Sequence, residues 1–253
     1  MMQLNVDAYL QRSGYHGDRS PTLETLRALH RAHLLSVPFE NLNIARGWPI
    51  LTTEQALFQK IVVGRRGGFC YELNGLFAAL LRALGFDVTL LSARVVEGAA
   101  EVGPEFDHLT LLVQLEECWL ADVGFGDSFV EPLRLDQPEE QVQDSGSYRV
   151  MHDGEQWSVL ERVAGEWKPQ YYFGLQPRRI EDFNAMCRFH QSSPDSPFTR
   201  KRVCTRATGS GRITLSDNRL TVTEHGQRAE RQLRGDDEWD AILREHFGIT
   251  LPR

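Results

Sequence analysis

The sequence of 253 residues contains few cysteines, and no two of them are close enough in the sequence to form a paired motif. Four are present, Cys70, Cys118, Cys187 and Cys204, and no two of them form a CxxC motif. Isolated cysteines supply neither the paired ligands of a structural zinc site nor the framework of a disulfide-rich secreted domain. We therefore expect reduced thiols, no bound metal and a cytoplasmic location.

Long hydrophobic runs and an excess of positive charge are also missing. No apolar stretch approaches the roughly 20 residues that cross a bilayer, and the first residues lack the basic and apolar regions of a signal peptide. The formal net charge is −7, whereas binding to nucleic acid needs a basic surface. Neither a membrane nor a nucleic acid is expected as a partner.

The first third of the chain has the apolar spacing of helices. One helix is predicted to start with Ser20 as its N-cap and Pro21 at its first position, and to end before Pro38. Another is predicted to begin near Cys70 and to stop at Gly85, a residue that favours helix C-termini.

Beyond this point the apolar pattern changes to the alternation of strands. In the middle third, strands are predicted over residues 87–96, 108–115, 118–123, 148–151, 157–160 and 167–172. In the last third, strands are predicted over 200–205, 211–215 and 219–224, and helices over 180–190 and 237–247. The order indicates helices first, then an antiparallel sheet or small barrel, then a mixed segment.

The segment 66–74, RGGFCYELN, places a cysteine directly after two glycines and at the start of an apolar helix. Glycines allow close backbone approach, and the positive end of a helix favours a thiolate over a thiol. Cys70 is therefore a candidate nucleophile.

Two strands of the middle third carry the side chains that a nucleophilic thiol needs. His108 opens an apolar strand, and Asp122 follows the next strand in an apolar setting, where a carboxylate must be paired. A tight turn at 116–117 brings both to the same end of an antiparallel pair. Asp122 is predicted to orient His108, and His108 to take the proton of Cys70 and leave a thiolate at neutral pH.

Each of these residues also has a structural interpretation. A buried cysteine is usually an inert small hydrophobe, a histidine at a strand start often only donates a hydrogen bond, and an aspartate before glycine often forms a turn. Cys118, Cys187 and Cys204 are interpreted in this way. His30 and His33 lie on one helix without carboxylate partners and are interpreted as surface or packing residues.

Four segments, 37–43 (VPFENLN), 66–74 (RGGFCYELN), 107–109 (DHL) and 122–126 (DVGFG), match a known family in their order and separations. On these segments the chain resembles the arylamine N-acetyltransferases along essentially its whole length.

The resemblance implies an α+β fold with a core like that of cysteine proteases. Its three lobes would be an N-terminal helical bundle over 1–85, a central antiparallel β-barrel over 86–190 and a C-terminal α/β lid over 191–253. The Cys-His-Asp triad of the family falls on Cys70, His108 and Asp122, with the nucleophile in the first lobe and the other two in the second.

The same resemblance implies a chemistry and a pocket. Acetyl-CoA would acetylate the cysteine as a donor co-substrate, with no tightly bound cofactor, and an arylamine, hydrazine or N-hydroxyarylamine would then accept the acetyl group. Backbone N–H groups near Cys70 and Phe125 would stabilise the oxyanion. Phe39, Phe69, Val95 and Phe125 would line the acceptor site, although Phe69 is also interpreted as plain core. Gly124 and Gly126, with Phe125 between them, would let CoA approach the backbone.

Two further groups of residues carry expectations. Arg66 is predicted to pair with Glu40 or Asn43 and to clamp the helical lobe. The basic run 198–206 either contacts the phosphates of CoA or forms a strand with a solvated face, and the second interpretation is favoured.

Other functions remain open at this stage. An amide synthase that closes an amide from a polyketide thioester would keep the same triad, a hydrolase would use water as the acceptor, and an inactive binding protein would keep only the fold. The oligomeric state, the physiological amine and the length of the acyl group are not determined by the sequence.

Overall fold

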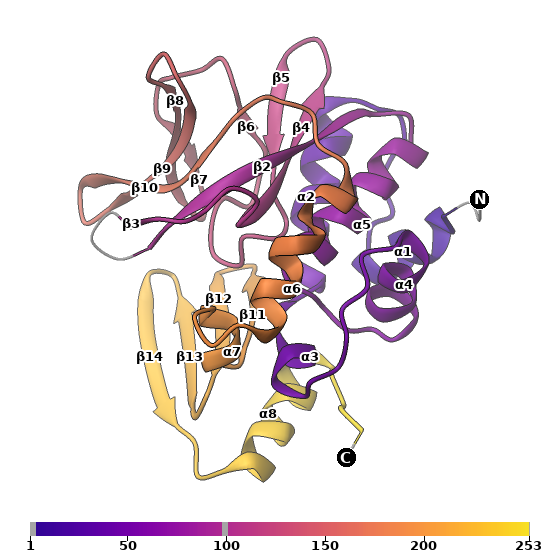
Figure 1. The fold of residues 1–253 in the computed structure, drawn as a ribbon, viewed down its shortest axis with the longest axis vertical. Coiled ribbons are helices and arrows are strands. Elements are labelled where there is room, and N and C mark those ends of the chain that lie inside the picture. Colours follow the sequence, from indigo (N-terminus) through magenta and orange to yellow (C-terminus); the bar gives the residue numbers. More distant parts are fainter. Residues whose placement is uncertain (1–3, 98–100, 253) are drawn as a thin grey trace.

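The structure is a computed structural model and describes residues 4–97 and 101–252. Figure 1 shows three groups of elements: helices α1, α2, α4 and α5 on one side, a barrel of strands β2 to β10 beside them, and below them a second sheet with helix α8 and the short helix α3. Helix α6 lies where the three groups meet. None of the helices in the described ranges combines the length and the hydropathy that crossing a bilayer requires.

The helical group follows the predicted order, with changes at the helix ends. Its elements are α1 (Val6–Ser13), α2 (Leu23–Ser36), α3 (Leu42–Ala45), α4 (Glu54–Phe58), the π-helix η1 (Gln59–Val63) and α5 (Cys70–Ala83). Helix α2 begins two residues later than predicted, because Thr22 and not Ser20 is its N-cap. The Thr22 side chain accepts a hydrogen bond from the backbone N–H of Thr25, which satisfies a donor that the helix itself leaves free.

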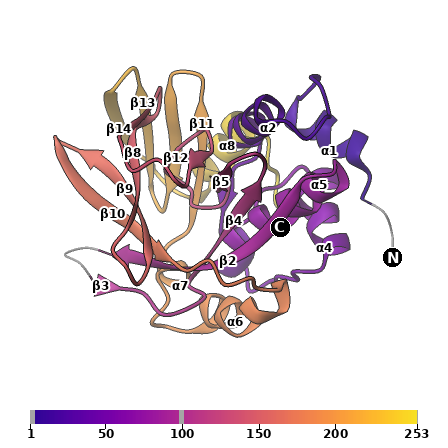
Figure 2. The same ribbon diagram turned by 90° about the horizontal axis from the view of Figure 1, so that it is seen from above.

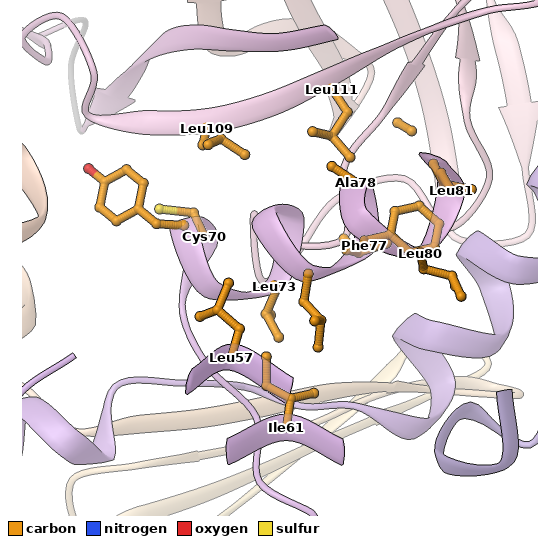
Figure 3. Close-up of a cluster of buried hydrophobic side chains, with 14 of the residues drawn as sticks. Leu57, Ile61, Cys70, Leu73, Phe77, Ala78, Leu80, Leu81, Leu109 and Leu111 are labelled. Atoms are coloured by element: carbon orange, nitrogen blue, oxygen red, sulfur yellow. The ribbon is translucent and has the colours of Figure 1, made fainter. Parts of the chain in front are cut away.

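Helix α5 is almost entirely buried, which explains why apolar residues occupy all its sides and not a single stripe. Figure 3 shows the helix between two apolar layers, with Leu109 and Leu111 of the barrel on one side and Leu57 and Ile61 on the other. The first residue of this helix, Cys70, is thereby fixed within the main hydrophobic core.

The second group is one antiparallel sheet in the order β6-β5-β4-β2-β10-β9-β8-β7, with β3 paired to β2. The strands are β2 (Asp87–Glu97), β3 (Glu101–Val102), β4 (His108–Gln114), β5 (Cys118–Ala121), β6 (Leu133–Arg134), β7 (Gln141–Gln143), β8 (Gly146–His152), β9 (Trp157–Val163) and β10 (Glu166–Phe173). The sheet curls into an almost closed barrel. Its two end strands are joined through the Gln141 side chain, which accepts from the backbone N–H of Arg134 and donates to its carbonyl.

The third group holds a five-stranded antiparallel sheet in the order β1-β11-β12-β13-β14. Its elements are β1 (Phe39–Glu40), η2 (Ile180–Phe183), α6 (Asn184–Ser192), α7 (Pro197–Arg200), β11 (Val203–Thr208), β12 (Gly211–Ser216), β13 (Arg219–Glu224), β14 (Gln227–Gln232) and α8 (Asp236–Phe247). Helix α8 packs its predicted apolar face on this sheet as a second core.

Two elements cross the predicted lobe boundaries. Strand β1 belongs to the first third of the chain but pairs with β11, where Phe39 lies opposite Thr205. Helix α6 runs from Asn184 to Ser192 and therefore continues through the boundary expected after residue 190. Figure 2 shows this helix beside α7.

Candidate active site

The loop before Cys70 can approach other backbone closely only because it contains glycine. A Cβ on Gly67 would lie 1.9 Å from the carbonyl oxygen of Pro38, and one on Gly68 would lie 2.7 Å from the Cβ of Glu72. In this close packing the backbone N–H of Glu40 donates to the Gly68 carbonyl over 2.8 Å. The glycines thus hold the loop against strand β1, as the sequence suggested.

His108 and Asp122 meet at one end of the β4–β5 pair. In this antiparallel register Leu111 lies opposite Ala121, so the start of β4, where His108 stands, and the residue after β5, Asp122, come together. The His108 Nε2 lies 2.6 Å from Asp122 Oδ2, and both side chains are at most 3% exposed. The predicted contact is present, and it leaves the Nδ1 of His108 available for a second partner.

Asp122 is held in its ionised form. Burial acts to raise the pKa of this carboxyl, but the charge and hydrogen bond of His108, with those from Asn74 and Gly124, bring it below the usual value. The Asn74 side chain donates to Asp122 Oδ1 over 2.8 Å, and the backbone N–H of Gly124 donates to the same oxygen over 2.9 Å. An ionised Asp122 makes the His108 Nε2 the donor of their bond.

His30 and Asn74 support this pair, and the sequence analysis gave neither of them that role. His30 is fully buried, its Nε2 accepts the backbone N–H of Asp122 over 3.0 Å, and its Nδ1 lies 2.9 Å from the Val130 carbonyl. The surface interpretation of His30 is therefore wrong, and the packing interpretation is right, since its ring packs on Phe77 and Phe129. Its hydrogen bonds are an additional role, to loops about 100 positions further along the chain. One feature of the sequence could have identified Asn74 as a site residue: it is a polar side chain four positions after Cys70 in a largely apolar helix.

Cys70 and His108 line one cavity of about 100 Å³. The other lining residues are Phe39, Val95, Asp107, Gly124, Phe125, His190, Pro197 and Phe198. A larger hollow of about 480 Å³ near Asp127 and Arg212 contains no cysteine among its lining residues. The smaller cavity is therefore the candidate active site, since it combines a thiol with a paired histidine.

The burial of Cys70 acts against the thiolate expected at this position. Burial raises the pKa of this thiol well above its usual value, and the charges of Asp107 and Asp122 act in the same direction, against a hydrogen bond from the Leu109 backbone. Burial therefore opposes ionisation of Cys70, and the expected thiolate depends on transfer of the proton to His108 and not on the helix start alone.

The structure separates the predicted pocket residues into two groups. Phe39, Val95 and Phe125 line the cavity, and the Phe125 ring lies edge-on to His108 at 5.4 Å. Phe69 does not line it. This side chain is fully buried between the rings of Tyr71 and Phe198, so its predicted contact with substrate is wrong and its alternative interpretation as core applies.

At the two glycines that follow Asp122, the surrounding atoms leave little room for a side chain. A Cβ on Gly124 would lie 2.7 Å from Asn74 Nδ2 and 2.8 Å from the Cα of Cys70. Gly126 has a φ of +98°, and a Cβ there would touch the ring of Phe39 at 3.4 Å. Both glycines therefore let the 122–126 loop approach the nucleophile, a need that is separate from any contact with CoA.

The structure brings together the residues expected to clamp the helical lobe. Arg66 donates to Glu40 Oε1 over 2.8 Å and to the Asn43 side chain over 3.0 Å. Lys60 adds a second charge, 3.7 Å from Glu40 and 2.7 Å from Glu72. Glu40 is fully buried, and although burial opposes it, these cations hold the pKa of its carboxyl below the usual value.

Two arginines of the basic run 198–206 are engaged within the protein. Arg202 pairs with Asp236 over 2.6 Å and lies over the ring of Trp239, and Arg206 donates to the carbonyls of Leu35 and His246. Only the second half of the run is a strand, because α7 extends to Arg200 and β11 begins at Val203. Arg200 and Lys201 are exposed, whereas Arg202 and Arg206 have structural partners.

Comparison with known proteins agrees with this geometry. A family model described as N-acetyltransferase matches residues 22–253. The chain is 35% identical to the arylamine N-acetyltransferase of Escherichia coli (strain K12), over 97% of this chain and 89% of the relative.

Solved structures give the same result. The arylamine N-acetyltransferase from Salmonella typhimurium matches with a TM-score of 0.93 and 34% identity, over 100% of this chain and 94% of that chain. The Mycobacterium marinum arylamine N-acetyltransferase in complex with CoA matches with a TM-score of 0.91 and 31% identity, over 97% and 93%.

One relative carries a different name. The proansamycin X synthase of Amycolatopsis mediterranei (strain S699) is 32% identical over 96% of both chains. The α+β architecture and the comparisons over nearly the whole chain agree on one assignment: this chain belongs to the arylamine N-acetyltransferase family of acyltransferases.

Proposed function

We propose that the protein transfers an acetyl group from acetyl-CoA to the nitrogen of arylamines and hydrazines, and to the oxygen of N-hydroxyarylamines. The reaction proceeds by a ping-pong mechanism through an acetylated Cys70. The observation that carries the proposal is the buried cavity that Cys70 shares with the His108–Asp122 pair. Membership of the family supplies the donor and the class of acceptor.

In the first half-reaction, the proton of Cys70 passes to the free Nδ1 of His108. The raised pKa of the thiol opposes loss of the proton to solvent, but a transfer to His108 leaves the total charge of the site unchanged, and Asp122 stabilises the imidazolium. The sulfur attacks the thioester carbonyl, a carbon–sulfur bond forms to Cys70, and the bond to CoA breaks. His108 returns the proton to the CoA sulfur.

In the second half-reaction, the amine nitrogen attacks the acetyl group of the modified Cys70. His108 accepts the amine proton as general base and passes it to the departing Cys70 sulfur. The backbone N–H groups of Val123 and Gly124 are already bonded to Asn74 and Asp122. The oxyanion donors of the proposal are therefore the backbone N–H groups of Cys70 and Phe125.

The residues around Cys70 are assigned to the acceptor or to the donor according to where they lie relative to the reacting atoms. Phe39, Val95 and Phe125 provide an apolar wall for the ring of the acceptor. The loop formed by Gly124, Phe125 and Gly126 contacts the donor, because it lies beside Cys70 where the thioester must enter. No metal takes part in this mechanism.

The setting of the reaction is part of the proposal. None of the four cysteines, all within the described residues, is in a disulfide, and a nucleophilic Cys70 needs reducing conditions. We assign the protein to the cytoplasm and to the conversion of foreign aromatic amines, with acetyl-CoA and amine as its partners.

The test is the mass of the intact protein after brief exposure to acetyl-CoA. We expect a gain of one acetyl group, absent in Cys70→Ser and retained in Cys118→Ser, which removes a more exposed thiol. Addition of an arylamine should remove the acetyl group and release the N-acetylated amine. Acetylation that persists in Cys70→Ser would refute the assignment of the nucleophile.

The alternative amide synthase has one observation in its favour, the likeness to proansamycin X synthase. The same mass measurement separates the two functions. An amide synthase would remain unmodified by acetyl-CoA but would form an adduct with a longer polyketide-like thioester. A hydrolase would release CoA continuously without any amine, and an inactive binding protein would release none.

A further inference from the structure

A second histidine–carboxylate pair lies in the wall of the same cavity, and the mechanism above does not use it. The Nε2 of His190, from helix α6, lies 3.2 Å from Oδ1 of Asp107, which directly precedes β4. Both residues line the cavity together with Cys70 and His108. The pair thus joins two segments that are more than 80 positions apart in the sequence.

The proton on His190 can be assigned from its surroundings. The His190 Nδ1 lies 3.1 Å from the Ser196 hydroxyl, and that hydroxyl already accepts the backbone N–H of Phe198. The Asp107 carboxylate beside Nε2 favours the hydrogen on that nitrogen, and Nδ1 then accepts from the Ser196 hydroxyl. The Nε2 of His190 consequently carries the hydrogen and faces Asp107.

The contact between the two side chains is incomplete. His190 is only 2% exposed, yet its Nε2 has no aligned hydrogen-bond acceptor among the described residues. A buried donor without an aligned acceptor costs free energy. His190 lines the cavity, so a group bound against its ring would be the acceptor that the protein itself does not supply.

The pair is fixed in place from several directions. The His190 ring stacks on Tyr71 at 6.1 Å and meets Phe198 edge-on at 5.1 Å. Tyr71 in turn donates from its hydroxyl to the backbone carbonyl of Asp107 over 3.1 Å, and Asp107 Oδ2 accepts the backbone N–H of Val95 over 3.3 Å. This packing keeps the donor and the acceptor preorganised for a ligand.

The arrangement is not a second catalytic triad. Ser196 is fully buried and does not line the cavity, and its hydroxyl donates to His190 and accepts from Phe198. A nucleophilic serine would need access to substrate and a histidine that takes its proton. The pair can therefore bind a ligand but not attack it. It offers one hydrogen-bond donor, the His190 Nε2–H, and one acceptor group, the Asp107 carboxylate.

We propose that Asp107 and His190 form the specificity-determining end of the acceptor site. They select acceptors whose ring carries a neutral group that both accepts and donates a hydrogen bond, such as a hydroxyl or a carboxamide. The inference rests on the proposed acetyl transfer and names the subclass of acceptor that it uses. The carboxylate of Asp107 repels an anionic substituent, so aromatic carboxylates are disfavoured.

The chemistry of the remaining wall makes this selection effective. Phe39, Val95, Phe125, Pro197 and Phe198 offer apolar surface. Away from Cys70 and His108, a polar substituent therefore finds side-chain hydrogen-bond partners among the lining residues at Asp107 and His190. An acceptor that places a methyl group there leaves both polar groups unpaired, and a site built for a hydroxyl rejects the analogue that lacks it.

The test is an internal competition between two acceptors in one reaction, because the product ratio gives the ratio of their kcat/KM values and is independent of the fraction of active protein. The pairs are para-aminophenol against para-toluidine and para-aminobenzamide against para-toluidine, with the meta isomers run in the same way. The proteins are the unaltered chain, His190→Leu and Asp107→Asn. Arg188→Leu, an exposed position of the same helix, is the control.

We expect the preference for the hydroxyl or carboxamide over the methyl group to fall about tenfold or more in His190→Leu, in at least one ring position, as expected for loss of a hydrogen bond to a fixed polar group. Because each variant is compared with the unaltered chain, the intrinsic reactivities of the amines cancel. Arg188→Leu should keep the original ratio. In Asp107→Asn, the kcat/KM for para-aminobenzoate relative to that for para-toluidine should rise about tenfold.

The outcomes that overturn the inference are separate from those that overturn the proposed function. If no acceptor is acetylated by the unaltered chain, the acetyl transfer itself is refuted. If it acetylates amines but the ratios of His190→Leu stay within about twofold in both ring positions, the inference is wrong. A preference of the unaltered chain for the aminobenzoate that disappears in His190→Leu would also refute it, because His190 would then bind anions as a cation.

Discussion

Lowering the pH from 7.5 to 5 should destabilise the folded protein through His30. This histidine is fully buried, and its two ring nitrogens are taken up by the Asp122 N–H and the Val130 carbonyl. Burial lowers the pKa of His30 from 6.5 to about 4 against the opposing effect of these two partners. The folded protein thus holds His30 neutral in a pH range where the unfolded chain protonates it.

The sign and size of the effect follow from this difference in pKa. The contribution of neutral His30 to the free energy of unfolding is fully present above pH 6.5. It declines as the pH falls towards 4, because the unfolded chain binds a proton that the folded chain does not. At pH 5 this difference in protonation multiplies the unfolding equilibrium constant by about 30, which lowers the free energy of unfolding by about 2 kcal/mol. His33, also buried and with its pKa lowered mainly by burial, adds to the loss with the same sign.

The assay is the free energy of unfolding in urea at pH 7.5 and pH 5, for the unaltered chain and for His30→Gln. Glutamine keeps an acceptor for the Asp122 N–H but does not titrate. We expect His30→Gln to be less stable at pH 7.5 and to lose about 2 kcal/mol less on acidification. His16→Gln, at an exposed position, controls for removal of an imidazole. Equal losses in the unaltered chain and His30→Gln would refute the reasoning.

Two other substitutions test the supports of the site. Arg66→Ala should lower the free energy of unfolding by roughly 3–5 kcal/mol, because it removes a partner of the buried Glu40 carboxylate; a loss below about 1 kcal/mol in denaturant unfolding would contradict the clamp. Gly124→Ala should reduce acetylation of Cys70 at least ~10-fold, because the new Cβ would lie 2.7 Å from Asn74 Nδ2. Gly174→Ala, where no atom lies within 4 Å of the added Cβ, is its control, and equal acetylation rates would contradict the packing argument.

Elements with strong local patterns were the ones that the sequence predicted. Helices α5 and α8 and strands β2 and β4 lie within one or two residues of their expected bounds, because an apolar face or buried run marks each of them. Strand β14, Gln227–Gln232, was missed, since all its side chains are exposed and it has no apolar alternation. The start of α2 was misplaced because both Ser20 and Thr22 are good N-caps, and only the observed bond to Thr25 decides between them.

The candidate site was predictable where a motif marks it and unpredictable where distant segments meet. Cys70, His108 and Asp122 stand in short motifs, and the structure brings the last two into contact and the first two into one cavity. His30 and His190 carry no such signal, since their partners lie far along the chain. The thiolate was expected from the helix start and from His108, whereas the burial of Cys70, which opposes its ionisation, comes from the whole fold and is not visible in the local sequence.

The cavity that holds Cys70 draws its wall from segments near residues 39, 70, 108, 125 and 190–198. During synthesis the thiol leaves the ribosome more than a hundred residues before helix α6 does. A nascent or truncated chain that stops short of residue 184 therefore contains the reactive sulfur without the cover that shields it. Such chains should be alkylated or oxidised at Cys70 far faster than the complete protein, and quality control of unfinished copies would be chemical as well as conformational.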